Sequence, residues 1–112
     1  MYNVLSELNK TSGIKGSMLV GSDGIIIAAD LDSQLEDETV GAMSASIVSS
    51  VAKAMERIKG EEPAQITVEA DHGKLFLANA GVGILTVIAD REVNIGLVRL
   101  EMKNAIAKIS GQ

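Results

Sequence analysis

The chain has 112 residues, of which 46% are hydrophobic and 22% charged, so its composition is that of one globular domain rather than of a disordered segment. Its net charge of -5 argues against nucleic acid or an anionic membrane as the main partner, and the absence of cysteine excludes disulfides, thiolate chemistry and cysteine-based metal sites. The N-terminus has no basic segment followed by an apolar run, and no stretch has the length of a membrane span. We therefore expect a single domain over residues 1–112, in the cytoplasm and without direct membrane insertion.

A short helix and a hairpin are predicted first. The apolar positions of the helix recur on one face, at Met1, Val4, Leu5 and Leu8. Gly13 ends this segment, and strands are predicted at 17–21 and 25–29 around Ser22-Asp23-Gly24, a sequence typical of a tight hairpin turn. The second strand contains three consecutive isoleucines, so we expect it to be covered on both faces of the sheet.

A long helix is predicted from about Glu36 to Lys59, and it is the centre of the interpretation. Its apolar positions recur at three- and four-residue spacing and define one buried face: Val40, Met43, Ile47, Val51, Ala54 and Ile58. Another side carries small residues where a solvated helix would carry Lys and Glu: Gly41, Ala42, Ala45, Ser46, Ser49 and Ala52. Small side chains let another backbone come close, so we predict that a second copy of the chain covers this side. The alternative is a solvated helix that tolerates small residues.

The second half predicts three strands and a final helix. A half-polar strand at 64–70 and two more at 75–80 and 84–89 are separated by glycine-containing turns, and the last of them is apolar enough to be central. The final helix runs from about Val93 to Ile109, with Asp90 and Asn94 as candidate caps. Short turns within each group of strands require antiparallel pairing. The fold class is therefore α+β, in the order α-β-β-α-β-β-β-α, with a five-stranded antiparallel sheet and helices on both faces.

No set of residues predicts a catalytic, cofactor or metal site. His72, the single histidine, lies in a predicted tight turn, where a solvated polar residue is expected more than a catalytic base. The glycines at 81 and 83 lack the lysine and hydroxyl of a phosphate-binding loop. Acidic residues that resemble a cation site lack the glycine of an EF-hand and lie where a helix dipole favours carboxylates: Asp30, Asp32, Glu36, Asp37 and Glu38.

Two stretches, GSDGIIIAADLD (21–32) and LTVIADREVNIGLVRLEMKNA (85–105), resemble the roadblock (dynein light chain) domain. The second is the more specific, and the residues that carry it are Asp90, Asn94, Gly96, Leu97, Arg99 and Leu100. The resemblance covers essentially the whole chain. It implies that the first and last helices lie on one face of the sheet and the long helix on the other. It also implies a homodimer with side-by-side long helices, in which the third strands pair edge to edge through Ile66, Thr67, Val68 and Glu69.

The resemblance implies a regulatory function rather than an enzyme. Stand-alone bacterial and archaeal members are similar to regulators that bind Ras-like small GTPases and accelerate their hydrolysis, so this chain is expected to act on a partner's active site. An arginine finger is the sharper alternative, but Arg57, Arg91 and Arg99 are the only arginines and none is predicted in a long exposed loop. We expect the GTPase to contact the long helices at Ser46, Ser50 and Lys53.

Two competing functions come from other classes. One is a pure dimeric assembly module, like a dynein light chain scaffold, with no GTPase partner. The other is a small-ligand sensor, which is weakened by the shortage of polar groups at predicted inward positions. The sequence separates neither from a GTPase regulator by itself.

Overall fold

The computed structural model describes residues 1–58 and 60–111 of the chain. The element order agrees with the prediction: α1 (Tyr2–Leu8), β1 (Ile14–Val20), β2 (Ile26–Leu31), α2 (Asp37–Ile58), β3 (Gln65–Ala70), β4 (Gly73–Asn79), β5 (Ile84–Ala89) and α3 (Ile95–Ser110). The predicted limits hold to within three residues, and the predicted end of the long helix at Lys59 lies outside the described residues. All strands pair antiparallel in the order β2-β1-β5-β4-β3, so the apolar strand β5 is central, as expected.

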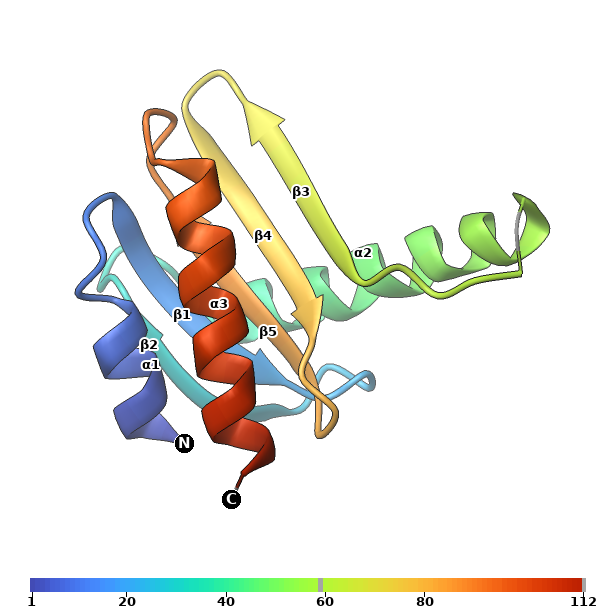
Figure 1. Cartoon of the computed structure of the whole chain (residues 1–112), viewed down its shortest axis with the longest axis horizontal. Coiled ribbons are helices and arrows are strands. Elements are labelled where there is room, and N and C mark those ends of the chain that lie inside the picture. The colour runs from blue at the N-terminus through green and yellow to red at the C-terminus, as the bar shows by residue number, and fades with distance from the viewer. Residues whose placement is uncertain (59, 112) are drawn as a thin grey trace.

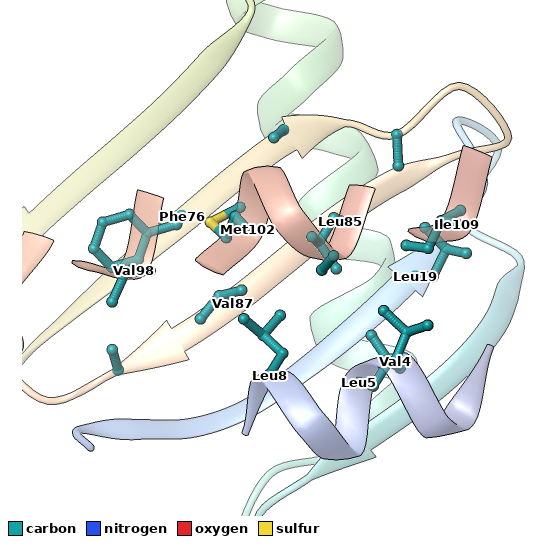
Figure 2. Close-up of a cluster of buried hydrophobic side chains, with 14 of the residues drawn as sticks. Val4, Leu5, Leu8, Leu19, Phe76, Leu85, Val87, Val98, Met102 and Ile109 are labelled. Carbon is teal, nitrogen blue, oxygen red and sulfur yellow. The ribbon is translucent and has the colours of Figure 1, made fainter. Parts of the chain in front are cut away.

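Helices α1 and α3 lie on one face of the sheet, as the resemblance implied (Figure 1). Figure 2 shows the cluster that they form with the central strands, in which Leu5 and Met102 come from the helices and Phe76 and Val87 from the sheet. Alternate residues of a strand point to the same face, so every second apolar position of β4 and β5 contributes to this cluster. Complete burial of each large apolar side chain stabilises the fold by about 1.5–3 kcal/mol.

Helix α2 covers the opposite face and approaches it closely. Its buried residues are Val40, Gly41 and Ser44. A Cβ atom added at Gly41 would lie 3.3 Å from Ile26 Cγ1 and 3.4 Å from Val20 Cγ2, so only glycine allows the helix this approach without displacing its neighbours. The sequence pattern assigned Gly41 to the outward side, but in this chain it faces the sheet.

The predicted buried stripe of α2 is wrong at three of its positions. Met43 is 41% exposed and Ile58 is 69% exposed, and Ala54 is exposed as well. Close packing at Gly41 and Ser44 rotates the buried face of the helix away from Met43. The last turns of α2 extend past the edge of the sheet beyond β3, so no strand of this chain lies beneath Ile58 (Figure 1).

The prediction that the strand of isoleucines is covered on both faces is also wrong. The strand β2 is at an edge of the sheet, and Ile25 and Ile27 are exposed. An irregularity between Leu19 and Val20 of β1 shifts the register of the pair, and Ile27 has no directly opposed residue. A run of apolar residues marks β-propensity, which edge strands and central strands share.

Three of the predicted helix-end features are confirmed, but Asp90 does not cap α3, because its carboxylate instead pairs with Lys15 at 3.3 Å. The side chain of Asn94 accepts a hydrogen bond of 2.9 Å from the Leu97 amide and caps α3. Asp37 and Glu38 occupy the first turn of α2, where the helix dipole favours negative charge. Gly60, at a φ of +70°, donates its amide to the carbonyl groups of Met55 and Glu56 and closes the helix.

Candidate dimerisation and partner-docking surface

The polar groups of the described residues make local contacts and do not converge on a reaction centre. His72 is exposed in the turn between β3 and β4. In the acidic segment, Asp32 accepts a hydrogen bond from the Gln34 amide, and Glu36 accepts one from the hydroxyl of Thr39. Within residues 1–58 and 60–111, no three His, Cys, Asp or Glu side chains are grouped as metal ligands, and no helix is long and apolar enough to cross a membrane.

An open apolar groove runs beside α2 on its face of the sheet. Its floor is formed by Val68, Leu75 and Ile88, and Met43 forms part of the wall on the α2 side. Other lining residues come from the segment before α2, from the first turn of α2 and from the β3–β4 turn: Leu35, Glu36, Thr39, Val40, Asp71 and His72. Met43 is 41% exposed and Val68 is 40% exposed, so part of this apolar lining lies open to solvent.

The projecting end of α2 presents a second apolar surface close to this groove. Ile58 follows Val40 by about five helical turns at 3.6 residues per turn, so both side chains lie on the sheet-facing side of the helix. Val40 is covered by the sheet, whereas Ile58 lies where α2 has already passed the β3 edge. The end of α2 therefore projects beyond the sheet of its own chain, and Ile58 gives this end an apolar side.

The small residues of α2 lie mostly on the side away from the groove. A Cβ atom added at Gly24, in the β1–β2 turn, would lie 3.9 Å from the Cα of Ala42 and 4.0 Å from the Cβ of Ala45. Ala52 lines a smaller depression together with residues of the β4–β5 turn, and Ser49 is exposed. Most of the small residues that were predicted to contact a second copy thus lie beside turns of their own chain. The open groove lies next to Met43, on another side of the helix.

Strand β3 is the free edge beside the groove. A two-residue turn joins Ala70 to Gly73, which are directly opposed across the β3–β4 hairpin. In such a hairpin the flanking pair exchanges hydrogen bonds, so the amide and carbonyl groups of Gln65, Thr67 and Glu69 point away from β4. Side chains alternate as well, so Ile66 and Val68 face the α2 side while Thr67 faces α3.

The three residues predicted to contact a partner, Ser46, Ser50 and Lys53, are all exposed on α2. None of the three lines the groove. Ser50 follows Met43 by seven residues, about two turns, so these two side chains lie on the same side of α2, whereas Ser46 and Lys53 lie further round the helix.

The sequence pattern assigned Met43 to the buried face, and it did not indicate that the partly buried Leu75 and Ile88 line an open groove. It also missed the contact in which Arg99 donates a 3.0 Å hydrogen bond to the hydroxyl of Thr67 and so links α3 to the edge strand. One signal for Met43 was present. Gly41 and Ser44 flank it on the helix, and small residues at close-packing positions indicate which side approaches the sheet.

Comparison with known proteins identifies relatives over most of the chain. The model of the Roadblock/LC7 domain matches residues 1–89. Two uncharacterized proteins of Methanocaldococcus jannaschii are each 45% identical over 106 residues, which cover 95% of this chain and 93% of theirs.

Solved structures share the fold at lower identity. A Roadblock/LC7 domain from Streptomyces avermitilis is 24% identical, with a TM-score of 0.92 and coverage of 99% of this chain and 95% of that one. Myxococcus xanthus MglB is also 24% identical, with a TM-score of 0.90 and coverage of 98% and 91%. A structure described as MglB with tetrameric arrangement is 20% identical, with a TM-score of 0.83 and coverage of 96% and 82%.

Proposed function

The chain belongs to the Roadblock/LC7 domain family, and we propose that it is a homodimeric regulator that binds a Ras-like small GTPase and modulates its GTP hydrolysis. The family is a regulatory one, and the resemblance of the sequence to stand-alone GTPase regulators gives the partner class. In this proposal the chain is not itself an enzyme. It acts on the active site of its partner.

The observation that carries the proposal is the overshoot of α2 past the β3 edge, next to an open apolar groove on the same face. A two-fold axis through the middle of β3, perpendicular to the sheet, pairs β3 with its copy. The same rotation directs the projecting end of each α2 toward the other subunit. One operation thus covers the groove, the helix end and the free strand edge.

The resulting dimer has one ten-stranded sheet with two α2 helices side by side on one face. The groove-facing side of each helix, at Met43, contacts the other subunit. In the proposed dimer, Ser46, Ser50 and Lys53 of the two helices form one continuous patch that a single subunit does not present. We assign the GTPase to this patch.

The regulation proposed here is conformational. Arg57 and Arg99 lie within α2 and α3, and Arg91 lies in the short turn after β5, so each arginine is in or beside a regular element rather than on a long loop. A regulator without an arginine finger can still accelerate hydrolysis. It does so if it binds most tightly to the GTPase conformation in which the GTPase's own residues stabilise the transition state. The differential affinity for that conformation sets the size of the effect.

The alternative is a dimeric assembly module without a GTPase. It shares the dimer and differs only in what the α2 patch binds. Self-association of this fold is supported by the tetrameric arrangement described for MglB. Sedimentation equilibrium of the chain alone tests the dimer, and sedimentation with a GTP-loaded Ras-like GTPase from the same organism separates the two functions. A monomer at micromolar concentration contradicts both.

A further inference from the structure

A groove between α3 and the free edge of the sheet carries two positive charges, those of Arg99 and Lys103. Leu100 and Ile106 contribute its apolar lining, and Arg99 and Lys103 flank it. Arg99 donates to the neutral hydroxyl of Thr67. Within residues 1–58 and 60–111, neither cation lies within 4.0 Å of a carboxylate oxygen. The chain has a net charge of -5, so carboxylates are in excess, and two neighbouring cations without a carboxylate partner among the described residues are unexpected.

The nearest carboxylate on the same face of β3 belongs to Glu69. Side chains two residues apart in a strand share a face, so Glu69 points to the α3 side together with Thr67. Its side chain is 64% exposed, and its contact with Lys74 of the same chain is long, at 4.0 Å. Glu69 is therefore free to reach a cation beyond the edge of the sheet.

The register of the proposed β3 pair follows from the groups that point outward. A two-fold centre at Thr67 opposes Gln65 of one subunit to Glu69 of the other, and the outward groups of all three residues are hydrogen-bonded. If the two-fold axis lay two residues earlier, at Gln65, Thr67 would be opposed to Pro63, which has no amide hydrogen. If it lay two residues later, at Glu69, Thr67 would be opposed to Asp71, which lies in the turn. Thr67 is thus the centre that the strand favours.

We propose that Arg99 and Lys103 of one subunit bind the carboxylate of Glu69 of the partner subunit, so that two symmetric charge contacts set the register of the dimer and its selectivity for a second copy. In an antiparallel pair, opposed Cα atoms are about 5.5 Å apart and diagonal neighbours about 7–8 Å. A glutamate opposite Gln65 is diagonal to Thr67, and the Arg99 guanidinium already lies on the Thr67 hydroxyl. The side chain of glutamate spans the remaining gap. This inference rests on the proposed dimer.

The test uses two charge-reversal variants of the whole chain, Glu69→Arg and Arg99→Glu. Each places like charges together at both symmetric contacts, so each alone is expected to raise the dimer dissociation constant by roughly a hundredfold. An equimolar mixture of the two variants has Arg opposite Glu at both contacts. We expect this mixture to form a heterodimer with an affinity close to that of the unmodified homodimer.

Matched controls change the same charges elsewhere. Lys108→Glu reverses an exposed charge of α3 outside the groove, and Glu7→Arg reverses a carboxylate in an exposed ion pair of α1, so both controls are expected to dimerise normally. Recovery in the mixture excludes misfolding as the cause of the single-variant defects. Dimerisation of both single variants at full affinity, or failure of the mixture to recover, overturns the inference while the dimer itself stands. A monomeric unmodified chain overturns the dimer and the inference together.

Discussion

The hydroxyl of Thr86, in the central strand, donates a 2.9 Å hydrogen bond to the hydroxyl of Ser44, in α2. Both side chains are fully buried, and Ser44 in turn donates to the carbonyl oxygen of Val40 at 2.7 Å. A buried hydroxyl without a partner is costly, so this pair fixes which side of α2 faces the sheet. With Ser44 inward, Met43 must point toward the groove, and the proposed dimer surface follows from this rotation.

The first prediction tests this anchor. Ser44→Ala leaves the Thr86 hydroxyl buried without its acceptor, so we expect the free energy of unfolding to fall by about 1–3 kcal/mol. Ser44→Ala combined with Thr86→Val replaces both partners by apolar groups and is expected to recover much of the loss. Urea unfolding at one fixed protein concentration measures both variants. Equal stability of Ser44→Ala and the unmodified chain would contradict the assigned orientation of α2.

The second prediction tests the close approach of α2 to the sheet. Gly41→Val inserts a branched side chain against Ile26 and Val20, which would lie 3.3–3.4 Å from its Cβ, and we expect a loss of about 1–3 kcal/mol from overpacking. Ala42→Val is the matched control, since it adds the same type of side chain at an exposed neighbour. Thermal unfolding of both variants should show a lower midpoint for Gly41→Val alone. Similar midpoints would mean that residue 41 is not packed against β1 and β2.

Much of the fold was predictable from the sequence, because glycine-marked turns and apolar periodicity delimit each element. Asn94 and Gly60 gave the helix ends through local chemistry that does not depend on the rest of the molecule. The faces of α2 were less predictable. Periodicity marks apolar positions, but the rotation of the helix depends on Gly41 and on the partner of Ser44, which is 42 residues away in the sequence.

The candidate site was predictable only in part, for a related reason. The half-polar strand was predicted because Gln65, Thr67 and Glu69 alternate with apolar residues, and the resemblance to the roadblock domain implied that it is an edge strand. The groove was not, because its floor combines β3, β4 and β5 and is apolar in the same way as the core. An apolar strand residue is exposed when the helix that covers the sheet crosses it at another place. The crossing position depends on the packing of the whole domain, which local sequence does not determine.

The third prediction distinguishes the two sides of α2 as dimer contacts. Met43→Glu places a charge in the apolar groove, where an unpaired buried carboxylate disfavours association, and we expect the dimer to dissociate. Ser49→Glu introduces the same charge on the side of the helix where the sequence pattern had placed the seam. Sedimentation equilibrium should give a monomer for Met43→Glu and a dimer for Ser49→Glu. The reverse result would assign the interface to the small-residue side.

The fourth prediction concerns the amides of β3. If the strand pairs with its copy, the outward amides of Gln65, Thr67 and Glu69 are hydrogen-bonded in the dimer and exchange slowly with solvent. We expect their protection to rise with protein concentration, while that of β5 amides changes less. Hydrogen exchange followed by NMR measures each amide separately. Fast exchange at Thr67 in a sample shown to be dimeric would place the interface elsewhere.

If the dimer binds a Ras-like small GTPase and changes its hydrolysis rate, single-turnover GTP hydrolysis will show the change. The measurement follows a GTP-loaded Ras-like GTPase from the same organism with increasing amounts of the unmodified chain, and with a Ser46→Trp, Lys53→Glu double variant as the matched control. We expect a rate constant that changes and saturates with the unmodified dimer, and a much weaker effect of the double variant, which should keep the dimer and its melting temperature. A rate constant that stays unchanged at saturating concentrations of the dimer would show that this chain does not regulate the GTPase.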